Sequence, residues 1–123
     1  MSARLAPLAG WAQTAGKLLV DVGGVLQRSG RGEFDARATA VELRRPVRAF
    51  ARHAQRCPEP ALRQAAGRLA TAADAVRLAA LHAGLSGTPA STAAYQAAAD
   101  QFGGAVGEME AAVARVSGTF PHR

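Results

Sequence analysis

The feature that most constrains the fold is an apolar seam in the last third of the chain. Apolar residues recur there at alternating steps of four and three, at Tyr95, Ala99, Phe102, Val106, Met109, Val113, Val116 and Phe120. An α-helix places residues with this spacing along one stripe, and such a stripe is stable only when other helices cover it. The seam therefore predicts a long helix that packs against further helices.

The composition favours an all-α fold. About a quarter of the residues are alanine, isoleucine is absent, and 5% are aromatic. Alanine is the strongest helix former, whereas β-sheets are rich in β-branched and aromatic residues. A chain of 123 residues has the usual length of one domain, so we expect residues 1–123 to form a single helical domain.

A second seam lies near the N-terminus. It consists of Leu5, Leu8, Ala12, Ala15, Leu19, Val22 and Leu26. Beside it, Ala9, Gly16, Gly23 and Gly30 recur every seven residues. Glycine inside a helix costs up to about 1 kcal/mol relative to alanine, so we expect a neighbouring helix to approach this ridge closely. Residues 18–26 also resemble a strand, but a lone strand has no evident partner elsewhere in the chain, and we predict a helix.

Turn-forming residues separate four helical patterns, at about 3–28, 34–56, 60–84 and 89–118. Cys57-Pro-Glu-Pro60 is the firmest boundary, Gly84 before Leu85 predicts the end of the third helix, and Thr88 with Pro89 predicts the start of the fourth. Leu62, Leu69 and Val76 mark the apolar face of the third pattern. Short connections favour an antiparallel, up-down-up-down four-helix bundle. The alternative is two hairpins that complete their core only in a dimer.

The second helical pattern is sharply two-faced. One arc carries the apolar residues Leu43, Val47, Phe50, Ala51 and Ala54. A separate arc carries six arginines, Arg37, Arg44, Arg45, Arg48, Arg52 and Arg56. Pro46 lies within the pattern and lacks a backbone donor, so it predicts either a kink or a restart of the helix.

The positive charge is concentrated in the first half of the chain. Residues 1–57 carry ten basic and four acidic side chains, a net charge of +6, whereas residues 58–123 carry five of each and are neutral. Clustered arginines bind carboxylates and phosphates, so the six arginines are the candidate site for an anion or a partner. With few aromatic residues for base stacking, nucleic acid would bind through its backbone, without sequence reading. The alternative is a solvated helix face.

The sequence contains no catalytic constellation. It has neither a phosphate-binding glycine loop with Lys-Ser/Thr nor a nucleophile elbow, and no Glu-x-x-His pair of the di-iron bundles. His53 and Cys57 are four residues apart, but two ligands are too few for a structural zinc site. We therefore predict no catalytic residue, no metal site, no cofactor and no enzymatic activity.

Residues 60–120 resemble, in their alanine-rich texture, the helical hairpins of actinobacterial type VII secretion substrates. The Trp-x-Gly turn of that family is missing, because Trp11 is followed by Ala12 and Gln13. Its tail signal, a Tyr with an acidic residue four positions later, is also missing, because Asp100 follows Tyr95 by five. We do not assign the chain to that family.

The leading functional hypothesis is therefore a non-enzymatic helical-bundle protein that acts through protein–protein association, as a homo-oligomer or as a small subunit or adaptor of a larger assembly. The alternative is a basic subunit that binds the nucleic-acid backbone through the arginine face. A third possibility is a ligand pocket lined by Trp11, Phe50 and Phe102.

With no secretory signal pattern and no apolar run long enough to span a membrane, we expect a cytoplasmic protein, with signal-less export left open. Fourteen arginines against one lysine are typical of a GC-rich bacterial genome.

Overall fold

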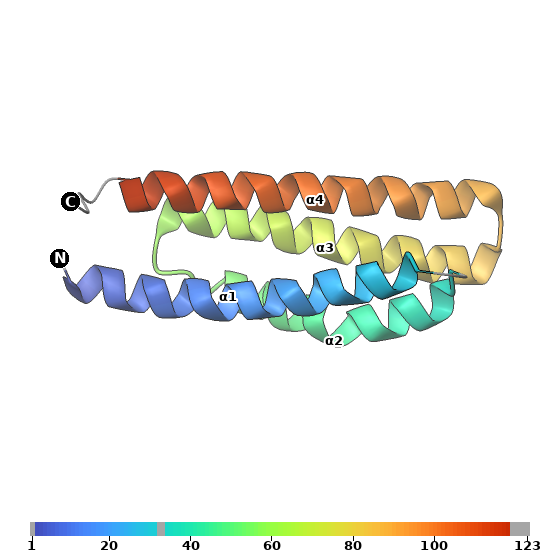
Figure 1. Cartoon of the computed structure of the whole chain (residues 1–123), viewed down its shortest axis with the longest axis horizontal. Coiled ribbons are helices and arrows are strands. Elements are labelled where there is room, and N and C mark those ends of the chain that lie inside the picture. Colours follow the sequence, from blue (N-terminus) through green and yellow to red (C-terminus); the bar gives the residue numbers. More distant parts are fainter. Residues whose placement is uncertain (1, 32–33, 119–123) are drawn as a thin grey trace.

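A computed structural model of the protein describes residues 2–31 and 34–118, and the side chains of 7–31 and 34–116. It consists of four helices, α1 (Ser2–Ser29), α2 (Ala36–Ala54), α3 (Pro60–Ser86) and α4 (Pro89–Gly118). The described residues contain no strand. Consecutive helices run in opposite directions (Figure 1), which confirms the predicted antiparallel, up-down-up-down four-helix bundle.

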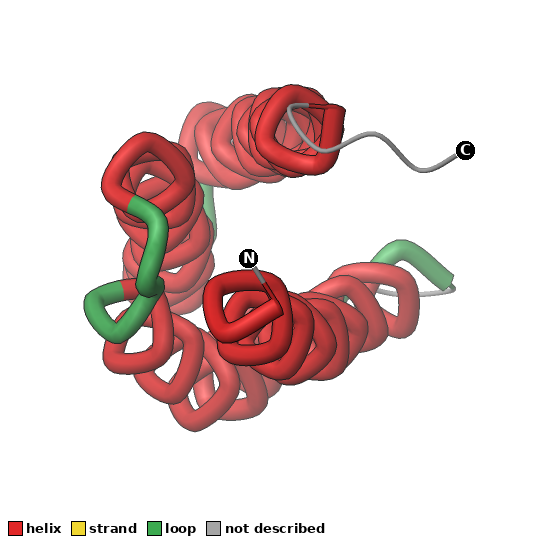
Figure 2. Tube along the Cα trace, turned by 90° about the vertical axis from the view of Figure 1, so that its left-hand side faces the viewer, coloured by secondary structure: helices red, strands yellow, loops and turns green. Residues whose placement is uncertain are grey.

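The bundle is open along one side. α1 packs on α2, α2 on α3 and α3 on α4, whereas α1 and α4 do not pack closely along their lengths. Viewed end-on, the four helices follow an open C (Figure 2), and α1 and α4 are its two ends. The central helix α3 is the most completely covered, since Leu62, Leu69 and Val76 are all buried, as predicted.

The predicted seam of α4 is only partly in the core. Tyr95, Phe102 and Met109, seven residues apart, are buried, whereas the seam residues Val106 and Val113 are half-buried. The first helix divides in the same way. Among its seam residues Ala15 and Val22 are buried, and Leu8, Ala12, Leu19 and Leu26 are half-buried. The side chains of Leu5 and Phe120, which the seams also include, lie outside the described residues.

Local hydrogen bonds place the helix ends. Asp35 caps α2 by accepting a bond from the backbone nitrogen of Ala38 at 3.1 Å. Thr88 caps α4, as predicted: its hydroxyl accepts from the backbone nitrogen of Ser91 at 3.1 Å, and the Ser91 hydroxyl accepts from the Thr88 nitrogen at 3.2 Å. This reciprocal pair satisfies two backbone donors that a helix start otherwise leaves free.

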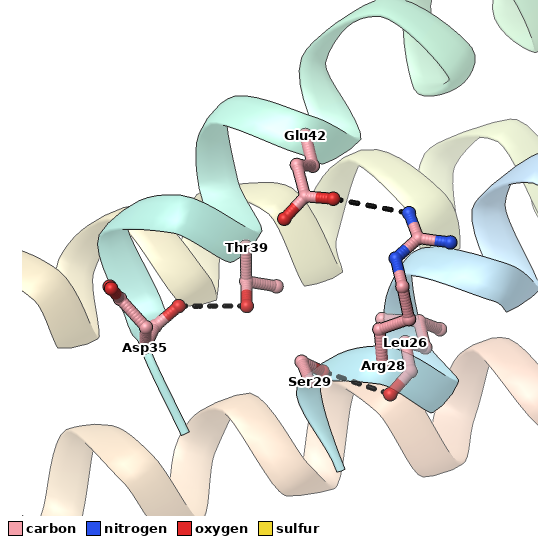
Figure 3. Close-up of polar contacts among 6 residues, drawn as sticks. All are labelled: Leu26, Arg28, Ser29, Asp35, Thr39 and Glu42. Atoms are coloured by element: carbon pink, nitrogen blue, oxygen red, sulfur yellow. Dashed lines mark hydrogen bonds and ion pairs between the residues drawn. The ribbon is translucent and has the colours of Figure 1, made fainter. Parts of the chain in front are cut away.

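The turn between α1 and α2 is held by polar contacts from both helices (Figure 3). The Ser29 hydroxyl donates to the Leu26 carbonyl at 2.9 Å, and the Thr39 hydroxyl donates to the Asp35 carbonyl at 2.8 Å. The Arg28 guanidinium pairs with the Glu42 carboxylate at 3.1 Å across the two helices. Both ends of that pair are largely exposed, so it contributes little to stability.

Both ends of α2 and the end of α3 differ by two residues from their approximate predicted positions. α2 spans Ala36–Ala54, against the predicted 34–56, and it continues through Pro46 as one helix, so the restart, one of the two predicted alternatives, does not occur. α3 passes Gly84 and ends at Ser86, where Gly87 takes the left-handed conformation with φ 65°. Gly84 has another role: a Cβ atom there would lie 2.8 Å from Cγ of Arg37. The glycine thus allows α2 and α3 to approach, which a search for helix ends cannot detect.

The prediction that a neighbouring helix closely approaches the glycine ridge of α1 is wrong within this chain. A Cβ atom added at Gly16 or Gly23 would meet no atom of another element within 4 Å. Gly103, Gly104 and Gly107 of α4 face open space in the same way. The described chain itself does not compensate the conformational cost of these glycines.

Candidate binding surfaces

All six arginines of the predicted site are exposed, and four of them share one surface. Arg44, Arg45, Arg48 and Arg52 line a hollow of about 420 Å³ together with Val41. We call these four residues the arginine surface. None of the four makes an ion pair or a side-chain hydrogen bond within the described residues. Their cationic groups are therefore available to an external anion.

The other two arginines lie apart. The Nε of Arg37 donates to the carbonyl of Gly84 at 3.4 Å, which holds it against the end of α3. Arg56 is in the turn after α2 and lines neither the hollow nor the groove beside it. The structure thus brings together four of the six predicted residues.

A groove between α2 and α3 extends the arginine surface. It has a volume of about 610 Å³ and contains Arg44 and Arg48 of α2 with Arg63 and Arg77 of α3. Arg63 and Arg77 are not among the residues predicted from the sequence to form a site. Their separation of fourteen residues places them on one face of α3, but only the antiparallel pairing of α2 with α3 brings that face beside the arginine surface.

The two α3 arginines are partly engaged. The Nε of Arg77 contacts a carboxylate oxygen of Asp74 at 2.9 Å, one helical turn away. The Nε of Arg63 donates to the carbonyl of Cys57 at 2.9 Å. Asp74 lines the groove as well, and it is the one carboxylate among the lining residues. The groove therefore has a strongly cationic α2 wall and a more nearly balanced α3 wall.

Small apolar residues form most of the rest of the α2–α3 groove, and Gln55 and Thr71 are its two uncharged polar lining residues. Between the arginines lie Val47, Ala51, Ala54, Gly67 and Ala70. A Cβ atom at Gly67 would meet nothing within 4 Å, so the space above it is open. No aromatic residue lines the groove. A segment that enters it meets a shallow apolar floor between charged rims.

A second groove, of about 560 Å³, lies at the open side of the bundle and is mostly apolar. From α1 it is lined by Ala12, Gly16, Leu19, Val20 and Gly23. From α4 it is lined by Phe102, Val106, Met109, Glu110 and Val113. Val20 is 73% exposed, unusual for a valine beside other apolar residues. The half-buried parts of both seams thus meet in the α1–α4 groove.

The third predicted possibility, a pocket shared by Trp11, Phe50 and Phe102, receives no support. Trp11 stacks on His53 with ring centroids 5.0 Å apart, and its Nε1 donates to the His53 carbonyl at 2.7 Å. His53 Nε2 lies 2.8 Å from the Trp11 carbonyl oxygen, which completes a reciprocal contact between α1 and α2. Phe50 is fully buried in the core, and of the three only Phe102 reaches the α1–α4 groove.

Cys57, the one cysteine, is buried at the turn before α3. Its Sγ lies 3.5 Å from the carbonyl oxygen of Glu59. Burial raises the pKa of the Cys57 thiol above its ordinary value, because a thiolate there loses hydration. Within residues 2–31 and 34–118, no three His, Cys, Asp or Glu side chains come together as metal ligands do.

No protein-family model, no curated protein and no solved structure matches the chain.

Among the described helices, none combines the length and the apolar character needed to cross a lipid bilayer.

Proposed function

We propose that this protein acts without catalysis, by self-association, and that the α1–α4 groove binds a second copy of the chain. The observation that carries the proposal is that the two half-buried seam halves meet in one open apolar groove. Exposed apolar patches with polar residues at their rim are found at protein–protein interaction sites. The proposal adopts the predicted alternative in which the core is completed by a partner chain.

The helix charges support a second copy as the occupant. The α1 sequence sums to +2, from Arg4, Lys17 and Arg28 against Asp21. The α4 sequence sums to −2, from Arg115 against Asp100, Glu108 and Glu110. A two-fold axis parallel to the helices brings α1 of each copy against α4 of the other, in antiparallel orientation. That arrangement pairs the positive helix with the negative helix twice.

The uncovered glycines support the same arrangement. Gly16 and Gly23 line the groove and have open space above them. Each glycine in a helix interior lowers the stability of the helix by up to about 1 kcal/mol relative to alanine. Close approach by a helix of the second copy offsets that cost, because backbones without side chains between them make more contacts.

The test is sedimentation equilibrium of the wild-type chain beside two matched variants. Val20→Asp places a carboxylate in the α1–α4 groove, and Val41→Asp makes the same change at an equally exposed valine, 74% against 73%, that lies beside the arginine surface and outside that groove. We expect a concentration-dependent dimer for wild type and for Val41→Asp, and a monomer for Val20→Asp. A wild-type chain that stays monomeric at high concentration overturns the proposal.

A further inference from the structure

We infer that the α2–α3 groove is a docking site for an acidic amphipathic helix of a protein partner. The site consists of the apolar floor of the groove and the arginines along its rim. It lies on a different pair of helices from the α1–α4 groove, so the inference does not depend on self-association.

The shape of the groove fits a helix. Its α2 lining residues span positions 44–55 and its α3 lining residues span 63–77, each at the three- and four-residue steps of one helical stripe. At a rise of about 1.5 Å per residue, these stripes are about 16 and 21 Å long. A helix of three to four turns occupies that length. The floor residues Ala51, Gly67 and Ala70 are small, which permits close approach of a third helix.

The charges of the groove define the partner's polar residues. Arg44 and Arg48 are one helical turn apart, with Cβ atoms about 5–6 Å from each other. Carboxylates at positions i and i+4 of a docked helix have the same spacing, so each can meet one guanidinium. Arg45 and Arg52 lie in the adjoining hollow and add to the positive field. None of these four has an internal anion within the described residues.

An acidic helix fits the groove better than a nucleic-acid strand does. Base stacking needs aromatic side chains, and the lining residues include none. A duplex carries its phosphates on a convex surface, so it would meet the arginine rim and leave the apolar floor empty. A helix with an alanine and leucine stripe between carboxylates covers both the floor and the rim.

The probe for the test is a fluorescent, alanine-rich helical peptide of about four turns. It carries a stripe of alanine and leucine flanked by glutamate pairs at i and i+4, and a second peptide has glutamine in place of every glutamate. Fluorescence anisotropy across a salt series measures binding to the full chain. A duplex and a single-stranded oligonucleotide are titrated in parallel.

We expect the glutamate peptide to bind, and the glutamine peptide to bind roughly tenfold more weakly or worse. The double substitution Arg44→Glu with Arg48→Glu should weaken glutamate-peptide binding by a similar factor. Arg31→Glu, an exposed charge reversal in the turn after α1, is the matched control and should leave binding unchanged. Failure of the glutamate peptide to bind at low salt overturns the inference.

Gly67→Leu separates a docked helix from a phosphate backbone on the rim. The leucine side chain extends into open space, so the chain keeps its fold, and circular dichroism with thermal melting confirms that. We expect the filled floor to abolish peptide binding. Peptide binding that persists in Gly67→Leu, or duplex binding tighter than peptide binding and lost in the arginine double variant, contradicts the acidic helix and assigns the surface to polyanions.

The variant Val20→Asp keeps the two proposals apart. Its substitution lies in the α1–α4 groove, away from the α2–α3 groove. It should bind the glutamate peptide as wild type does, whatever its state of association. If the wild-type chain does not self-associate but binds the glutamate peptide, only the proposed self-association is refuted. If it self-associates but does not bind the peptide, only the docking site is refuted.

Discussion

The α2–α3 pair and the α1–α4 edge are built from similar apolar repeats, yet the first is covered along its length and the second is open. On α3 the large repeat residues Leu62, Leu69 and Val76 are all at most 1% exposed. On α4 Phe102 and Met109 are buried, whereas Val106 and Val113 are only half-buried, and all four line the α1–α4 groove. The difference follows from position in the bundle. α3 has a neighbour on each side, whereas α1 and α4 are the ends of an open C.

A heptad seam therefore indicates that a helix has an apolar stripe. It does not indicate whether other helices of the same chain cover the whole stripe. The two sides also differ in charge. Exposed arginines border the closed α2–α3 pair, whereas the open edge is mostly apolar with Glu110 among its lining residues. The outer groove of the α2–α3 pair therefore has positively charged rims, whereas the α1–α4 groove is mostly apolar.

The largest expected effect is a difference in the free energy of unfolding between a substitution in the core of α3 and one in the α1–α4 groove. Leu69→Ala removes a side chain that is fully buried at the centre of α3, and should lower the free energy of unfolding by about 2–5 kcal/mol. Leu19→Ala, in the α1–α4 groove, should lower it by roughly 1 kcal/mol in the monomeric Val20→Asp background, because the side chain there is only half-buried. Urea denaturation measures both. Equal losses would mean that the open edge is packed like the core.

Substitution by alanine should change the free energy of unfolding with opposite signs at Gly16 and at Gly84. Gly16→Ala in the same monomeric background should raise the free energy of unfolding by up to about 1 kcal/mol, because the added methyl meets open space. Gly84→Ala should lower it by about 1 kcal/mol, since its Cβ would lie 2.8 Å from Cγ and 3.3 Å from the backbone nitrogen of Arg37. Thermal unfolding followed by circular dichroism measures the sign. Stabilisation by both substitutions would contradict the close α2–α3 approach.

The smallest effect concerns the buried thiol beside the α2–α3 pair. Burial raises the native pKa of the Cys57 thiol above its ordinary value, so the native state keeps its proton when the unfolded chain loses it. The contribution of this thiol to the free energy of unfolding should therefore be constant below the ordinary pKa of a cysteine, about 8.5, and fall as the pH rises above it. Cys57→Ala should remove that part of the decline in urea denaturation at a series of pH values. An unchanged pH dependence in the variant would mean that other groups cause it.

Much of the helical architecture was predictable because its determinants are local. The Cys57-Pro-Glu-Pro60 boundary and the Thr88 cap depend on neighbouring residues alone, and both lie where the sequence predicted. Gly84 shows the limit of local reasoning. It looks like a helix end, but α3 continues past it to Ser86, and Arg37, forty-seven residues away, packs against it.

The candidate surfaces were predictable in part for the same reason. The arginine face follows from the spacing of one helix: five of the six predicted arginines lie on α2, Arg56 lies in the turn after it, and all six are exposed. Arg63 and Arg77 could not be added from sequence, because their place beside Arg44 and Arg48 depends on how α2 and α3 are paired. The roles of these residues remain predictions that the proposed binding experiments test.

By itself, the sequence determined four amphipathic helices, most of their ends and the separation of charge from apolar surface on α2, because propensity, capping and periodicity act over a few residues. The tertiary structure alone decided which half of each seam is covered and which arginines share a groove. Those outcomes depend on contacts between residues far apart in the chain. Periodicity identifies an apolar face, and only packing identifies the neighbour that covers it.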